Sequence, residues 1–236
     1  YTFSNNFPMS DSAYQKELKY LTTALPDAFV SKFDSSGENL IFSTYIGGAV
    51  DDYAKSIAID ENEDIYVTGY TSGTTTFPTT AGAYSTKSKG GFDCFVLKLK
   101  KDGTNLIFST FIGGVKDDYA QAIGIDTFGN PYITGYTYLG SNFPLTENAF
   151  QKTNHGEFDV FLSKFNTNGS QLLFSTLLGG NSEEFGQTIY VLNEQNIYLS
   201  GFTRSSDFPV TENAYDKTYN DTSTIKSITS DVFLSK

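Results

Sequence analysis

The alternation of apolar and polar residues predicts short β-strands that recur with a fixed period along the chain. Each repeat holds four segments rich in β-branched and aromatic residues and bounded by Gly, Asn, Asp and Ser, the pattern of strands joined by turns. In the first repeat these segments are 27–33, 40–46, 54–59 and 65–70. Paired glycines follow the second segment and begin at Gly47, Gly113 and Gly179, so the period is 66 residues. A constant period of this kind indicates a repeat architecture.

Apolar residues occupy both faces of the expected strands, as in Ile57 and Ile59 opposite Ala54 and Ala58. A sheet packed on one side only would alternate more cleanly, so each sheet is expected to pack against copies of itself. A β-propeller blade fits this pattern, whereas the coils of a β-solenoid are usually much shorter. The sequence therefore predicts an all-β protein: a β-propeller segment of four-stranded antiparallel blades, each 66 residues long.

The predicted units begin at the first strand of each repeat. Three full blades cover 27–92, 93–158 and 159–230, residues 231–236 supply the first strand of a further blade, and residues 1–26 end a preceding repeat. Closed propellers have about four to eight blades. We therefore expect an open fragment of a longer propeller, whose remaining blades would be its partners.

The segments between predicted blades vary in length, whereas the blades themselves do not. Each segment begins at a Phe–Pro pair and continues to an aromatic residue that follows an alanine: Tyr14, Tyr84, Phe150 or Tyr215. Exposed loops on a rigid scaffold are frequent carriers of binding. We expect these aromatic residues to anchor the loop bases, and we assign Tyr84, Phe150 and Tyr215 to a candidate binding surface.

Acidic pairs follow each glycine pair, and their second members are Asp52, Asp118 and Glu184. On one interpretation, these three side chains accept backbone N–H bonds in the turn while their neighbours are solvated. The alternative is an arc of carboxylates that binds Ca²⁺, which takes several oxygen ligands. Because no Asp-x-Asp-x-Asp-Gly loop is present, the sequence favours the structural role and no cofactor, and Asp52, Asp118 and Glu184 stay candidate binding residues.

Composition removes several classes of function. The net charge is −11, which disfavours nucleic-acid and anionic-membrane partners because these require a basic surface. No apolar stretch approaches the roughly 20 residues of a membrane-spanning helix. Cys94 is the only cysteine, so neither an intrachain disulfide nor a thiolate metal cluster is expected. The aromatic share of 16% indicates a folded protein.

The residues offer little for catalysis. His155 is the only histidine and lies in a variable loop, and no Gly-x-Ser-x-Gly motif is present, so a Ser-His-Asp triad is not expected. The acids recur with the repeat, whereas catalytic groups usually break it. The chain is therefore predicted not to be an enzyme. The alternative is a carboxylate-dependent polysaccharide hydrolase, which would need two non-repeating acids in a cleft.

Several motifs of the first repeat resemble the SBBP-type (seven-bladed-type) β-propeller repeat of bacterial secreted and surface proteins. They are Phe42-Ser-Thr-Tyr-Ile-Gly-Gly48, Asp52-Tyr-Ala, Ile57-Ala-Ile-Asp60, Tyr66-Val-Thr-Gly-Tyr-Thr71 and Phe77-Pro78. The third copy departs from the pattern at Glu184 and at Leu192, which replaces an aspartate. Kelch and tryptophan–aspartate repeats fit less well because Trp is absent, and a sialidase-like site would need several arginines where the chain has only Arg204.

The resemblance implies a propeller at the cell surface or outside the cell, and it implies little about activity. The hypothesis that follows is a non-enzymatic binding or spacer scaffold of a bacterial secreted or surface protein. Its inter-blade loops would contact a glycan or a protein ligand.

Overall fold

The computed structural model describes residues 1–19, 25–72, 76–220 and 229–236. All regular elements in these residues are β-strands. Parts of three predicted inter-blade loops, residues 20–24, 73–75 and 221–228, lie outside the described residues.

The strands form four antiparallel sheets. The first sheet pairs β1 (Ala28–Phe33) with β2 (Leu40–Ile46). The second sheet has the order β3 (Asp52–Ile59), β4 (Ile65–Thr71), β5 (Asp93–Leu99), β6 (Leu106–Ile112). The third has β7 (Asp118–Ile125), β8 (Pro131–Tyr138), β9 (Phe158–Phe165), β10 (Leu172–Leu178). The fourth has β11 (Glu184–Asn193), β12 (Asn196–Thr203), β13 (Asp231–Ser235).

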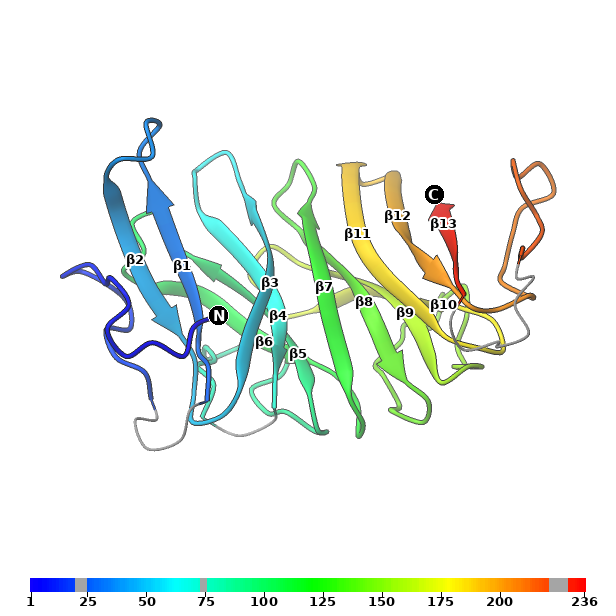
Figure 1. Cartoon of the computed structure of the whole chain (residues 1–236), viewed down its shortest axis with the longest axis horizontal. Coiled ribbons are helices and arrows are strands. Elements are labelled where there is room, and N and C mark those ends of the chain that lie inside the picture. The colour runs from blue at the N-terminus through cyan, green and yellow to red at the C-terminus, as the bar shows by residue number, and fades with distance from the viewer. Residues whose placement is uncertain (20–24, 73–75, 221–228) are drawn as a thin grey trace.

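The sheets follow one another in chain order from one end of the molecule to the other (Figure 1). Within the described ranges they do not close a ring. The prediction of an all-β, open propeller segment with four-stranded antiparallel blades is confirmed.

The predicted grouping of strands into blades is wrong by half a repeat. The boundaries 27–92, 93–158, 159–230 and 231–236 place the first strand of each unit at the start of a blade, but each complete sheet starts with the third strand. The long segment after β4 lets β5 return beside β4, whereas the short segment after β2 carries the chain into the next sheet. The described residues thus contain two complete sheets and two partial ones, in place of three full blades, and residues 1–26 lead into the first partial sheet.

Apolar side chains fill the space between consecutive sheets, as the apolar residues on both strand faces predicted. The first and second sheets meet through a cluster that includes Val30, Phe42, Ile65, Val67 and Phe95. The largest cluster joins the second and third sheets and includes Tyr66, Cys94, Val96, Phe108, Ala120, Ile123, Ile133 and Phe161. A smaller cluster joins the third and fourth sheets through Val160, Leu199 and Phe233. The core is therefore a series of interfaces between sheets.

Three phenylalanines of the Phe–Pro pairs fix their loops to a strand of the adjacent sheet. The rings stack in three equivalent pairs: Phe77 on Phe95 at 4.6 Å, Phe143 on Phe161 at 4.5 Å, and Phe208 on Phe233 at 4.8 Å between centroids. These contacts hold the loop bases against the sheets.

The glycine of each first hairpin has two structural roles. Gly37, Gly103 and Gly169 have φ values of +75°, +72° and +67°, a left-handed conformation that glycine adopts without steric cost. Gly103 also lies against the ring of Phe42 in the preceding sheet, where a Cβ would come within 2.4 Å of a ring carbon. Glycine at Gly103 and Gly169 therefore allows these two hairpin tips to contact the sheet before them.

Candidate functional site

The second acid of each predicted pair closes the turn after the glycine pair. The hydrogen bonds run from Gly48 N to Asp52 Oδ2 (2.7 Å), from Gly114 N to Asp118 Oδ2 (2.6 Å) and from Gly180 N to Glu184 Oε2 (2.7 Å). All three acids are fully buried. Glu184 makes the same bond as the aspartates, so the departure from the motif preserves the turn. Direct contact with a ligand would need exposure, which none of the three acids has.

Two of the first acids in the pairs, Asp117 and Glu183, are bound to protein groups. Asp117 Oδ1 accepts the N–H of Phe92 at 2.9 Å, and Glu183 forms an ion pair with Arg204. These side chains are half-buried and bound to protein groups. The prediction that they are merely solvated is therefore wrong for Asp117 and Glu183.

A second carboxylate approaches each turn from the start of a central strand. A Cβ placed on Gly113 would lie 1.8 Å from Asp93 Oδ1 and 3.0 Å from Asp118 Oδ2, so both carboxylates border this glycine. Asp27 borders Gly47 in the same way, and Asp159 and Glu184 border Gly179. This crowding explains why the first residue of each pair is glycine. The sequence indicated both acids but not their convergence, because they lie 25 residues apart.

Burial changes the protonation of these carboxyl groups. Burial raises the pKa of Asp52 and of Asp118 to about 7, and the nearby carboxylates of Asp27 and Asp93 add to the rise. Burial also raises the pKa of Asp27 and of Asp159 to about 6. The turns closed by Asp52 and Asp118 are therefore partly protonated near neutral pH. They lie out of reach of a substrate, so they suit a structural role better than acid–base catalysis.

The calcium alternative finds little support in this geometry. Within the residues that the structure describes, no group of three or more His, Cys, Asp or Glu side chains is placed to hold a metal ion. Each turn brings two carboxylates together, and in the middle turn both Asp93 and Asp118 already accept a backbone N–H. The role of calcium stays a matter for measurement.

The aromatic residues at the loop bases differ in their packing and exposure. Tyr84 packs edge-to-face on Phe165 at 5.7 Å, and its N–H donates to Gly169 O at 2.9 Å in the hairpin of the next sheet. Phe150 is 72% exposed, and Tyr215 is fully exposed. The prediction that they anchor the loops is therefore right for Tyr84 and wrong for Phe150 and Tyr215. The described part of the fourth sheet offers Phe150 no such hairpin.

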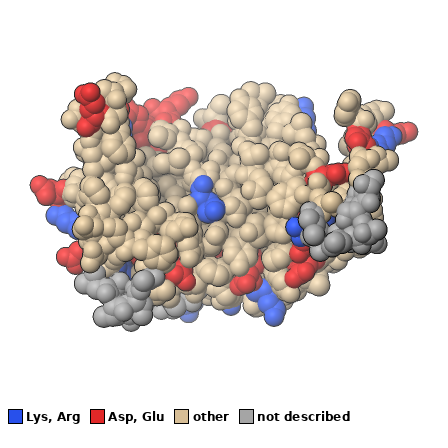
Figure 2. Space-filling model, viewed as in Figure 1, with Lys and Arg blue, Asp and Glu red and all other residues tan. Residues whose placement is uncertain are grey.

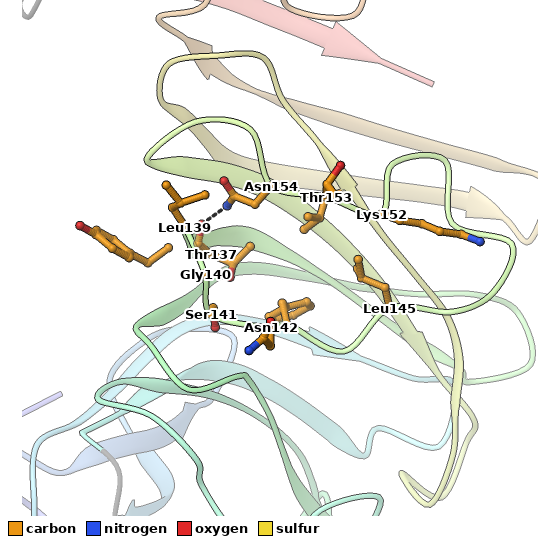
Figure 3. Close-up of a pocket in the computed structure, with 12 residues that line it drawn as sticks. Thr137, Leu139, Gly140, Ser141, Asn142, Leu145, Lys152, Thr153 and Asn154 are labelled. Atoms are coloured by element: carbon orange, nitrogen blue, oxygen red, sulfur yellow. Dashed lines mark hydrogen bonds between the residues drawn. The ribbon is translucent and has the colours of Figure 1, made fainter.

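A pocket of about 230 Å³ lies in the loop between β8 and β9 (Figure 3). Asn154 Nδ2 donates to Thr137 O at 3.0 Å across it, while the buried Asn154 Oδ1 has no hydrogen-bond partner. Leu139 and Leu145 supply apolar walls, and the exposed Lys152 lies at the rim. The pocket thus combines apolar surface with polar lining residues, and Lys152 carries an ammonium group at its rim.

A larger pocket of about 570 Å³ lies beside the N-terminal loop. Its lining includes Tyr14, Gln15, Lys16, Glu17, Thr76 and Pro78. Gln15 is itself engaged, because its Nε2 donates to Asp27 Oδ2 at 2.8 Å. Both pockets lie in the predicted inter-blade loops, where the length variation had placed the candidate binding surface.

The family comparison supplies the identification. Residues 41–77 match the family model described as SBBP, beta-propeller repeat. The chain contains an SBBP β-propeller repeat. The matched segment covers β2, the glycine pair, the turn closed by Asp52, β3, β4 and the loop anchor Phe77. A comparison with curated proteins gives no match.

The sequence analysis missed one recurring feature of the 66-residue repeat, a ladder of aromatic rings that crosses the sheets. Successive ring pairs are Tyr1–Tyr53, Tyr53–Tyr70, Tyr70–Tyr119, Tyr119–Tyr136, Tyr136–Phe185 and Phe185–Phe202, with centroids 4.6–5.2 Å apart. The signal was available, because an aromatic residue follows each turn acid and each later glycine at the same period. Such pairs add stability beyond their buried area, so the ladder ties neighbouring sheets together.

The described part of the chain contains no helix with the length and hydrophobicity needed to cross a membrane.

Proposed function

We propose that this β-propeller repeat module is a non-enzymatic scaffold of a bacterial secreted or cell-surface protein, and that it binds a glycan through the loop pocket between β8 and β9. The observation that supports this proposal is the pocket itself, which joins apolar walls to polar lining residues. The faces of the second and third sheets are occupied by packing, so their loops are the natural place for a ligand.

The chemistry of the pocket suits a sugar. A sugar hydroxyl can hydrogen-bond to Asn142 or Thr153, which are exposed lining residues, and the apolar face of the ring can lie against Leu139 or Leu145. The pocket is smaller than most sites for drug-sized ligands, which suits a single monosaccharide unit. Figure 2 shows that charged side chains lie mainly toward the rims of the molecule, where turns and loops gather.

The arrangement of carboxylates supports a non-catalytic role. A glycosidase needs two carboxyl groups on either side of the scissile bond. The lining of the pocket between β8 and β9 contains no carboxylate, and that of the N-terminal pocket contains only Glu17. The carboxyl groups with raised pKa values are enclosed in the turns. The hydrolase alternative therefore has no specific support in the two described pockets.

The location outside the cytoplasm rests on the SBBP repeat and fits a chain with a single cysteine, Cys94, which is fully buried. The net charge of −11 also disfavours binding to polyanions.

The test is a glycan array followed by titration calorimetry on the best ligand. The double variant Leu139→Ala/Lys152→Ala removes one wall and the ammonium group, and we expect affinity to fall about tenfold or more. The matched control Leu173→Ala/Lys87→Ala makes the same chemical changes at exposed positions outside the pocket lining. Retained affinity in the pocket variant, or the absence of any glycan ligand, would reject the proposal. Release of reducing sugar from a polysaccharide would favour the hydrolase.

A further inference from the structure

One wall of the pocket between β8 and β9 is fixed to the turn that joins the second sheet to the third. The wall consists of residues 138–141, and the turn consists of residues 113–118. Two backbone hydrogen bonds join them: Tyr138 N to Asp117 O at 3.0 Å, and Val115 N to Ser141 O at 2.5 Å. The position of this wall therefore depends on the turn.

Ser141 also joins the wall to a buried carboxyl group. Its hydroxyl donates to Asp118, with Oδ1 at 2.9 Å and Oδ2 at 2.8 Å, and both side chains are buried. Asp118 Oδ2 also accepts the N–H of Gly114 at 2.6 Å. Ser141 lies between Gly140 and Asn142 at the edge of the pocket (Figure 3). One carboxyl group thus closes the turn and holds the pocket wall.

A second carboxyl group reaches the same turn from the second sheet. Asp93 begins β5, and its Oδ2 accepts the N–H groups of Lys89 and Gly90 at 2.7 and 3.0 Å. Its Oδ1 borders Gly113, as does Asp118 Oδ2. Asp93 Oδ1 is buried, and the described residues offer it no hydrogen-bond donor. A proton on either carboxyl group removes one of two like charges from this enclosed site.

The turn between the third and fourth sheets compensates its two acids more fully. Glu184 keeps the backbone bond described above, and its other oxygen accepts the hydroxyl of Thr203 at 2.6 Å. Asp159 Oδ1 accepts the N–H of Gly156, and its Oδ2 accepts the side-chain amide of Gln151 at 2.7 Å. Every carboxyl oxygen of this pair therefore has a donor, which distinguishes it from the pair of Asp93 and Asp118.

The charged and titratable groups around the Asp93–Asp118 pair place its ionisation near neutral pH. Burial raises the pKa of Asp118 to about 7, and Asp93 adds to the rise. Burial also raises the pKa of Asp93; its backbone donors and the exposed Lys89 oppose the rise, and Asp117 adds to it. Burial and both carboxylates raise the pKa of the Cys94 thiol, which stays neutral. The pocket wall contains no charged side chain.

We propose that the Asp93–Asp118 pair is a pH-sensitive switch that holds the pocket wall while the pair carries a proton and releases it when both carboxyl groups are ionised. Ionisation of both places two like charges in a buried site, and entry of water or separation of the turn from β5 relieves this repulsion. Either change displaces the turn that holds Tyr138 and Ser141. The effect of the switch on a ligand rests on the proposed glycan function, whereas its effect on the wall does not.

Hydrogen exchange of the pocket wall tests the switch without any ligand. The closed wall binds more protons than the open wall, because the pKa of Asp118 is about 7 when the wall is closed and about 4 when the carboxyl group is solvated. We therefore expect the protection of the amides of residues 138–141, corrected for the intrinsic pH dependence of exchange, to fall about tenfold from about pH 6 to about pH 8. Mass spectrometry of peptic fragments of the full chain measures this protection.

Two variants remove one charge each from the pair. Asp118→Asn and Asp93→Asn keep an oxygen for the backbone donors, so we expect the wall to stay closed and the tenfold fall to disappear in both. The use of both keeps the test decisive if one variant does not fold. Asp102→Asn changes an exposed turn and is the matched control, which should keep the fall. A fall that persists in the Asp118 and Asp93 variants, or native protection that does not change with pH, would overturn the proposal.

Titration calorimetry with the best-bound oligosaccharide of the glycan array connects the switch to the pocket. We expect the affinity of the native chain to be about tenfold higher at about pH 6 than at about pH 8, and that of Asp118→Asn to be equal at both. An affinity of the native chain that is the same at both pH values would overturn the control of binding by the switch. The absence of any glycan ligand would reject the proposed function alone, because the exchange experiment decides the switch.

Discussion

The second and third sheets are covered on both faces, whereas the first and fourth are covered on one. This difference separates what the local sequence determines from what a neighbouring sheet determines. Val160 and Val232 occupy the same place in the repeat and pair with equivalent residues of the neighbouring strand. Val160 is fully buried and Val232 is 82% exposed. The same local sequence gives the same strand at both places. Burial, and the stability that it brings, depends on whether another sheet follows, as expected for a stack with nearest-neighbour contacts.

The turn after the glycine pair shows the opposite behaviour, because it does not depend on position in the stack. The acid accepts the N–H of the second glycine in the first copy, in the middle copy and in the last. Turn geometry is therefore local, while sheet packing is shared between neighbours.

The largest predicted effect compares Phe165→Ala with Phe33→Ala. Both residues hold the same repeat position, but Phe165 is fully buried and Phe33 is 55% exposed. We expect losses of about 3–5 kcal/mol in unfolding free energy for the first and about 1 kcal/mol or less for the second. Urea denaturation of the two variants and the native chain measures both. Equal losses would show that burial by the neighbouring sheet does not set stability.

A smaller difference is expected between Gly169→Ala and Gly37→Ala. Both glycines have positive φ, so each substitution carries a similar backbone strain of about 1 kcal/mol. At Gly169 the new methyl group would also meet Phe108, at 2.3 Å from a ring carbon, and this adds about 1–3 kcal/mol. Thermal unfolding of the two variants isolates the contact. An identical change in the two variants would mean that the hairpin tip does not press on the preceding sheet.

The buried turn carboxyl group predicts that the unfolding free energy depends on pH. In the folded chain the pKa of Asp118 is about 7, above its usual value of 3.8, so the folded state binds more protons between these values. The unfolding free energy should therefore fall as pH rises from about 4 to about 7, by about 4 kcal/mol for this group. Asp118→Asn should flatten the slope, and its amide could donate to Asp93 Oδ1, which has no partner.

Asp102→Asn is the control for this experiment. Asp102 lies in an exposed turn, where the side-chain hydrogen bond from Thr104 lowers its pKa. Its replacement should leave the slope between about pH 4 and pH 7 unchanged. An Asp118→Asn slope equal to that of the native chain would contradict the role of burial at the turn.

The smallest expected effect is that of calcium. The turn acids are enclosed and bonded to backbone groups, so the unfolding midpoint should be the same in excess calcium and in chelator. A site would instead raise it, by about 2.7 kcal/mol of stability at a hundredfold excess over its dissociation constant. A rise that is lost in Asp118→Asn and kept in Asp102→Asn would establish the cation site.

The sequence predicts what local chemistry decides. Strand positions, the positive φ of Gly103 and the backbone bond of Asp118 all follow from residue type and turn pattern. The period of 66 residues does not reveal where one sheet ends, because each long loop and each glycine pair recurs equally often. The convergence of Asp93 on Asp118 and the exposure of Phe150 depend on neighbours in space. The repeat pattern in the sequence reveals neither of these features.

The most direct test of this account is the unfolding free energy of Val160→Ala and Val232→Ala, measured side by side in urea. The two variants remove the same atoms from the same position of the repeat, and only the following sheet differs. We predict a loss of about 1–3 kcal/mol for Val160→Ala and a change within about 0.5 kcal/mol for Val232→Ala. Equal losses would contradict the claim that each sheet of this molecule is stabilised by the sheet packed against it.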